Sequence, residues 1–187
     1  MKGSVEMKKV KNIAIIVVFV CCCIFLVHHF LIGNWSSSNI KRYIEMAESK
    51  DALPKIEELG SYSDIEFKYY RKNMLMFFSD AYTLRVSYDA ENYRTEKEKF
   101  SQKYVFETET LYDDGGYGKK PYFEMDFFSF KLLSYENYEL LSYPHDIVFI
   151  GFSDEKNEIA IVHYYDFDLD YIDCSFPEFL EEECGWE

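Results

Sequence analysis

The chain has 187 residues and a formal net charge of −14, with 34 acidic residues against 20 Lys and Arg. Residues 1–33 carry four Lys and one Glu, so residues 34–187 carry a net charge of −17. This balance argues against nucleic-acid binding, which needs clusters of Lys and Arg, and against adsorption on anionic lipid. Aromatic residues make up 19% of the chain, which excludes intrinsic disorder and predicts a folded core.

The first predicted element is an apolar run, residues 13–32, that contains no formally charged side chain. A helix of this length would span ~30 Å, the thickness of a bilayer core. The lysines before the run outnumber the cations that follow it within a comparable length, so the positive-inside rule places the N-terminus in the cytoplasm. These cations are Lys2, Lys8, Lys9 and Lys11 before the run, and Lys41 and Arg42 after it.

We therefore predict a cytoplasmic tail over residues 1–11 and an uncleaved transmembrane signal-anchor over residues 12–33. The remainder would lie outside the cell membrane as a single-pass protein. A cleaved signal peptide is the alternative, but its apolar region is normally ~7–15 residues long and ends in small residues. Acylation of Cys21 after cleavage is disfavoured by Val20. The adjacent cysteines Cys21, Cys22 and Cys23 act as small hydrophobes in this prediction, and palmitoylation stays open.

The segment 34–60 is predicted as a linker and a juxtamembrane helix. A polar linker, Asn34 to Asn39, precedes apolar residues at helical spacing that continue to near Ala52. Ser38 or Asn39 can cap this helix. The stretch KIEELG predicts one further turn, closed by Gly60.

Residues 61–187 are predicted to form one extracytoplasmic domain. Alternation predicts strands in DIEFKYY and YTLRVSYD, with a hairpin turn at Ser79–Ala81 after the apolar stretch NMLMFF. DAENYRTEKEKFSQKY predicts a helix capped by Asp89, with a stripe of Tyr93, Phe100 and Tyr104 on its buried side.

The second half of this domain changes to strand patterns. Residues 113–120 predict an exposed loop, and residues 122–133 a strand with an irregularity at Phe127–Phe128. HDIVFIGF and EIAIVHYYDFDLD predict a hairpin joined by SDEKNE, and FPEFLEEECGWE a terminal helix or turn. Separate runs of helix and strand predict an α+β domain with an antiparallel sheet and packed helices.

Three aspartates alternate in the last predicted strand: Asp166, Asp168 and Asp170, with Asp173 following. The odd positions of this strand are apolar or aromatic, so we interpret the aspartates as one wet face and His163, on the dry face, as a core residue. A calcium loop that began at Asp166 would need Gly at Tyr171 and Glu at Pro177. We therefore predict no metal site and no cofactor.

No catalytic motif is present around the two histidines of the predicted domain, His145 and His163, so we assign no catalytic residue. Cys174 and Cys184 are the only cysteines after the anchor, and they either form a disulfide or remain two free thiols. The 33 acidic residues after residue 33 could still contain a carboxylate pair that only the fold would bring together.

These observations favour a membrane-anchored, non-enzymatic binding domain that recognises a protein or peptide partner, with a basic partner favoured by the negative charge. Two alternatives stay open. One is an envelope hydrolase that uses paired carboxylates, and the other is a structural accessory subunit that joins a membrane complex through its anchor. A pocket with closely spaced acids would favour the hydrolase, and an exposed aromatic surface would favour binding.

Overall fold

The computed structural model describes residues 2–49, 53–74, 77–112, 118–134, 145–166, 180–181 and 186. Its regular elements combine three α-helices and one short 3-10 helix with ten strands over this part of the chain. The helices are α1 (Lys2–Leu31), α2 (Ile40–Ser49), the 3-10 helix η1 (Ile56–Glu58) and α3 (Ala90–Lys103). The strands are β1 (Ile32–Ser37), β2 (Asp64–Met74), β3 (Phe77–Ser87), β4 (Val105–Phe106), β5 (Leu111–Tyr112), β6 (Gly118–Lys119), β7 (Tyr122–Met125), β8 (Phe128–Ser134), β9 (His145–Ser153) and β10 (Glu158–Asp166).

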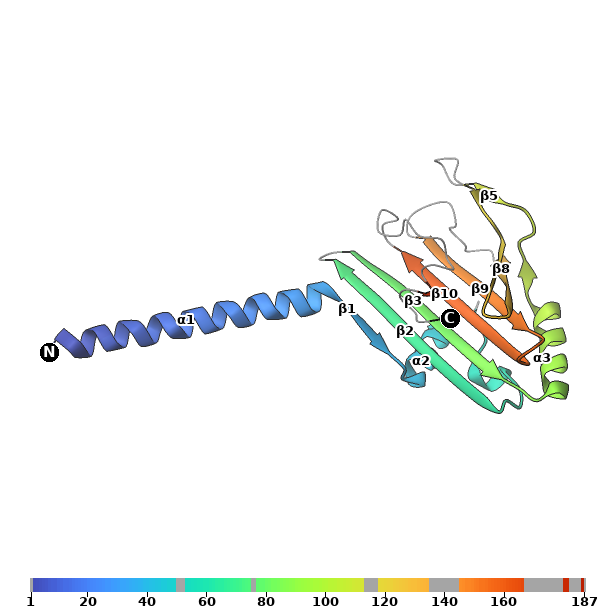
Figure 1. Ribbon diagram of the computed structural model, residues 1–187, viewed down its shortest axis with the longest axis horizontal. Helices are drawn as coiled ribbons and strands as arrows, with labels where there is room; N and C mark the ends of the chain where they lie inside the picture. The colour runs from blue at the N-terminus through green and yellow to red at the C-terminus, as the bar shows by residue number, and fades with distance from the viewer. Residues whose placement is uncertain are drawn as a thin grey trace.

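One antiparallel sheet organises the molecule (Figure 1). Its strands follow the order β1-β2-β3-β10-β9-β8-β4, with β7 paired to β8, while β5 and β6 form a separate ribbon. Each neighbouring pair is antiparallel, and β3 pairs with both β2 and β10 along its length. The predicted α+β class with an antiparallel sheet is confirmed.

Helix α1 projects away from the sheet (Figure 1). It covers most of the segment that the sequence predicted to be a transmembrane anchor. Within the part of the chain that the structure describes, no helix combines the length and the apolarity needed to cross a membrane. This finding contradicts the transmembrane signal-anchor and the single-pass cell-membrane localisation. The accessory-subunit hypothesis, which depended on the anchor, is not retained.

The segment after α1 is a strand where the sequence predicted a linker. Ile32 and Gly33, the last residues of the predicted anchor, pair with β2, and so do residues 34–37. Backbone pairing with β2 explains the difference, because a polar sequence can form an edge strand when its neighbour supplies the hydrogen bonds. The helix that follows is confirmed, with the Asn39 side chain accepting a hydrogen bond from the Lys41 amide at 3.1 Å. Gly60 closes the next turn at φ 68°.

The predicted turn at Ser79–Ala81 is wrong, because these residues lie inside β3. Ser79 pairs with Lys72, and Asp80 pairs with Arg71 on β2. In the sequence, the polar residue Asp80 suggested a turn. In the structure, the Asp80 carboxylate lies within a strand and accepts hydrogen bonds from Arg71 and Tyr69. The preceding strand therefore extends as β2 to Met74.

The predicted helix at residues 90–103 is confirmed as α3. The Asp89 side chain accepts hydrogen bonds from the amides of Glu91 and Asn92 at 3.0 and 2.8 Å. The irregularity predicted at Phe127–Phe128 is instead a hairpin turn between β7 and β8. Asp126 and Phe127 form this two-residue turn with φ of 47° and 66°, and they reverse the chain so that Met125 pairs with Phe128.

Both faces of the sheet are covered by apolar clusters. The first face packs against α2, η1 and α3, and its cluster includes Tyr43, Leu84 and Phe100. The second face packs against Leu180 and Trp186, with Trp186 5.6 Å from Phe128 between ring centroids.

The even face of β10 is buried over the residues whose side chains are described, and the wet face predicted for the aspartates stays a prediction. Ala160, Val162 and Tyr164, the even positions, are buried in the second cluster. His163 is buried on the first face, as predicted. Asp168, Asp170, Asp173, Cys174 and Cys184 lie outside the described residues, as does most of the predicted terminal helix.

Candidate functional site

The first face of the sheet changes from apolar to charged along its strands. Cross-strand partners share a face, so the registers of β2, β3, β10 and β9 define rows of neighbouring side chains. In that strand order the rows are Phe67, Leu84, Ile161 and Ile150; then Tyr69, Tyr82, His163 and Val148; then Arg71, Asp80, Tyr165 and Asp146. The last two rows bring seven polar or ionisable groups together at one end of the sheet.

Helix α2 lies beside these rows and leaves a cleft of about 450 Å³. Tyr43 packs α2 onto the sheet through edge contacts with Phe67 and Tyr82, at 5.9 and 6.1 Å between ring centroids. Its hydroxyl donates to the Pro54 carbonyl at 2.7 Å, which fixes the helix to the next turn. The cleft is lined by Arg42, Glu45, Met46, Ser49, Tyr69, Arg71, Phe78, Asp80, Tyr82, His163 and Tyr165.

Asp80 links two strands at the floor of the cleft. Its Oδ1 accepts hydrogen bonds from Arg71 Nε at 2.6 Å and from the Tyr69 hydroxyl at 2.5 Å, and its Oδ2 accepts from Arg71 Nη2 at 2.5 Å. Burial, and next the hydrogen bond to Asp80, raise the pKa of Tyr69 well above its ordinary value, so Tyr69 stays a donor. Both oxygens of Asp80 are therefore occupied by the chain's own donors.

His163 forms the second polar pair of the site. Its Nε2 lies 2.5 Å from Asp146 Oδ1, and its ring stacks on Tyr82 with 4.5 Å between centroids. The other ring nitrogen, Nδ1, is buried. The His163 side chain is only 4% exposed, and its Nε2 is engaged with Asp146.

The walls of the cleft are stacked aromatic rings and guanidinium groups. The Arg42 guanidinium lies 3.9 Å from the centroid of Tyr69, and that of Arg71 lies 4.3 Å from the centroid of Phe78. Phe78 also stacks on Tyr165, with centroids 5.5 Å apart and an interplanar angle of 24°. Phe78 stands on β3 between Arg71 on β2 and Tyr165 on β10, so the stack crosses three strands.

Tyr165 lies between two aspartate positions on the neighbouring strands. Asp80 and Asp146 pair with Tyr165 from the strands on either side of it. Burial first, and then the charges of Asp146 and Asp80, raise the pKa of the Tyr165 phenol. Burial, the larger cause, disfavours any charged group at this position, and the two carboxylates add to the effect on the phenolate.

The sequence identified this site only in part. His163 was predicted as a core residue, and Asp80 was assigned to a turn. The signal that could have placed Asp80 is the alternation of Phe78, Asp80, Tyr82 and Leu84, which continues unbroken through the predicted turn. Arg71, Tyr165 and Asp146 had no local signal, because only the strand registers bring them together.

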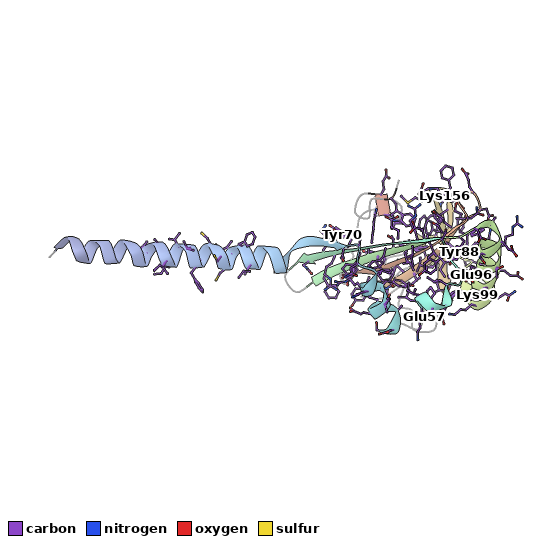
Figure 2. All side chains as sticks on the ribbon, turned by 90° about the horizontal axis from the view of Figure 1, so that it is seen from below. Glu57, Tyr70, Tyr88, Glu96, Lys99 and Lys156 are labelled. Carbon is purple, nitrogen blue, oxygen red and sulfur yellow. The ribbon has the colours of Figure 1, made fainter. Side chains whose placement is uncertain are left out.

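A second polar cluster lies at the α3 end of the sheet, where Figure 2 labels Tyr88, Glu96 and Lys99. Glu96 is buried and pairs with Lys99 at 3.0 Å, while the Tyr88 hydroxyl donates to the Leu59 carbonyl at 3.0 Å. Lys99 also donates to the Glu58 carbonyl, which joins the turn before Gly60 to α3, and we assign these contacts to the fold. Among the described residues, no group of three or more His, Cys, Asp or Glu could hold a metal ion.

The comparisons with known proteins return no relative. No protein-family model matches the chain, and neither a curated protein nor a solved structure matches it. The function must therefore be inferred from the geometry of the cleft.

Proposed function

We propose that this protein is a binding protein, and that its cleft receives part of a protein or peptide partner that carries positive charge. The observation that carries this proposal is the half-buried stack of Phe78 and Tyr165 beside a cleft whose ionisable floor is already internally bonded. Aromatic side chains that are presented at the surface with their positions fixed are typical anchors for recognition.

The charge distribution supports a basic partner. Residues 34–104 contain twelve cationic and twelve acidic residues, whereas residues 105–187 contain four Lys and 21 acidic residues. The acidic half of the chain includes β9 and β10, which supply Asp146 and Tyr165 to the site. The net negative charge of residues 105–187 would steer a cationic segment toward these strands.

Panning random phage-displayed peptides against the immobilised full-length chain tests this proposal. We expect enriched peptides of net positive charge that bind Tyr165→Leu at least ~10-fold more weakly than the wild type, as for an aromatic anchor. Tyr122→Leu, a control at an exposed tyrosine of β7 outside the cleft lining, should leave binding unchanged. Enrichment that does not depend on Tyr165, or no enrichment, would refute a peptide-binding cleft.

One observation favours a hydrolase as a second candidate. Asp80 and Asp146 flank Tyr165 on opposite sides, so their Cα atoms lie two strand spacings apart, ~10 Å. Inverting glycosidases place their two carboxyl groups ~6.5–9.5 Å apart. Against this candidate, Arg71 and Tyr69 already occupy both oxygens of Asp80. Turnover of nitrophenyl glycosides by the wild type, abolished in Asp146→Asn, would favour the hydrolase over the binding protein.

A further inference from the structure

We propose that the outer edge of β1 pairs with β1 of a second copy of this chain, and that the two sheets join across a two-fold axis. The proposal concerns the edge of the sheet rather than the cleft, so it is independent of the proposed binding function. It is carried by the composition of β1, by the direction of its backbone groups and by the distribution of charge along the sheet.

β1 is an edge strand without the usual protection. Among the described strands, β2 is the only one that pairs with β1. An edge strand presents unpaired backbone groups, which proteins usually protect with charged side chains, proline or a bulge. β1 has the sequence IGNWSS, with neither a charge nor a proline, and its register with β2 contains no bulge. By contrast, β4 and β7 at the other edge have only two and four residues, and Pro121 directly precedes β7. The edge of β1 is therefore the one that is open to another strand.

The alternation of hydrogen bonds across the sheet identifies which backbone groups of β1 point outward. The Ser87 carbonyl, at the end of β3, accepts from the Ser63 amide beside β2, so the odd-numbered residues of β3 face β2. Successive residues of a strand direct their backbone groups to opposite sides, so the two registers turn the odd-numbered residues of β1 toward β2. Ile32, Asn34 and Ser36 therefore direct their N–H and C=O groups away from the sheet.

A second copy of β1 matches these outward groups. With a two-fold axis at Asn34, the two Asn34 residues face each other, and Ile32 of each copy faces Ser36 of the other. Each of these is a pair that exchanges both N–H···O bonds, so every outward group of the three residues finds a partner. Helix α2 leaves this edge open because its Tyr43 packs on residues of β2 and β3, and α1 projects from the end of β1 (Figure 1).

The distribution of charge permits two copies to meet at β1. Residues 34–104, which include β2 and β3, contain twelve cationic and twelve acidic residues, whereas residues 105–187 contain four Lys and 21 acidic residues. In a sheet joined at β1, the strand order separates the two β10 strands by about seven strand spacings, or ~34 Å. This separation far exceeds the Debye length of ~8 Å at physiological ionic strength. Contact at the opposite edge would instead bring the two acidic halves together.

Sedimentation velocity of the full-length chain over a range of concentrations tests the proposal. We expect a weak, reversible dimer, because a contact made by one short strand is small. Ser36→Pro removes an outward amide and leaves the pairing with β2 intact, so it should raise the Kd of the dimer at least ~10-fold. Glu124→Pro is the matched control, since it removes an outward amide of β7 at the opposite edge, and it should dimerise as the wild type does. Circular dichroism confirms that each variant is folded.

A charge exchange at the two-fold axis tests the register. Asn34→Lys and Asn34→Asp each place like charges opposite each other, so each variant alone should dimerise at least ~3-fold more weakly. An equimolar mixture of the two variants should regain the association, because opposite charges then face each other, and a misfolded variant could not produce this recovery.

Three outcomes would overturn the proposal. A wild-type chain that is monomeric at every concentration would leave this edge to a strand from another protein. Assembly that Ser36→Pro does not weaken would place the contact elsewhere, such as on the exposed apolar residues of α1. A mixture of the Asn34 variants that associates no better than either alone would refute the two-fold pairing.

Discussion

At the scale of single residues, Asp80 holds the polar end of the cleft together. Its side chain is 15% exposed, and it binds Arg71 through both oxygens while also accepting from Tyr69. The side chains of Asp80, Arg71 and Tyr69 depend on one another. Loss of the Asp80 carboxylate would leave the Arg71 guanidinium and the Tyr69 hydroxyl without this acceptor in a partly buried site. The same carboxylate fixes the guanidinium that stacks on Phe78.

We predict that Asp80→Ala lowers the free energy of unfolding by about 2–3 kcal/mol, between the effects of surface and fully buried pairs. The double variant Asp80→Leu with Arg71→Met should lose clearly less, because it replaces both charges by apolar groups. Urea unfolding of the single and double variants measures both values. Additive losses of Asp80→Leu and Arg71→Met in the double variant would show that the pair is not coupled.

At the scale of elements, the β7–β8 hairpin is held in a demanding turn. Asp126 and Phe127 both have positive φ, a conformation in which glycine is favoured at the second position. The Asp126 carboxylate binds Lys156 at 2.8 Å, which anchors the hairpin to the turn between β9 and β10. Phe127 is 63% exposed, so little burial offsets the strain of its backbone.

We predict that Phe127→Gly raises the free energy of unfolding by about 0.5–1.5 kcal/mol. A non-glycine residue in the left-handed region costs of order 1–3 kcal/mol, and glycine removes this cost. The gain exceeds the free-energy cost of the additional conformational entropy that glycine gives to the unfolded chain. A thermal melt compared with the wild type measures the change. Tyr122→Gly in the adjacent strand is the control and should destabilise, since glycine there relieves no positive φ. A lower melting temperature for Phe127→Gly would refute the strain argument.

At the scale of the whole molecule, ion pairs join segments that are distant in the sequence. Lys103 on α3 binds Glu58 of η1 at 2.9 Å, and Lys97 on α3 binds Asp154 after β9 at 2.5 Å. The hydrogen bond from Lys103, and next that from the Lys55 amide, lower the pKa of Glu58. Hydrogen bonds from Lys97 and then Tyr93 lower the pKa of Asp154.

We predict that stability decreases as the pH falls below about 4, the ordinary range of these carboxyl groups. The pKa values of Glu58 and Asp154 are lower in the folded state, so the unfolded state binds more protons in this pH range. The two carboxylates therefore stabilise the fold in full only at a pH above their pKa values in the unfolded chain. This stabilisation is lost as the pH falls through the lowered, folded values. Urea unfolding across this range measures the slope, which should be shallower in a Lys97→Met, Lys103→Met variant. An unchanged slope in that variant would contradict the role of these pairs.

The sequence by itself determined the α+β class, the helix cap at Asp89, and the hairpin of β9 and β10, because caps and alternation act through neighbouring residues. It left the cap of α2 open between Ser38 and Asn39, and the structure selects Asn39. The transmembrane prediction rested on the length of one apolar segment and on the lysines that precede it. It is contradicted because, in the part of the chain that the structure describes, no helix is long and apolar enough to cross a membrane.

Only the tertiary structure decided the burial of both faces of β10 and the position of Asp80 within β3. The physical reason is that a polar residue becomes compatible with a strand interior only when another strand supplies its partners. Arg71 is nine residues from Asp80, and Asp146 is seventeen residues from His163. Alternation fixes which face a side chain occupies, but the register between strands fixes which side chains meet, and that register depends on the packing of the whole sheet.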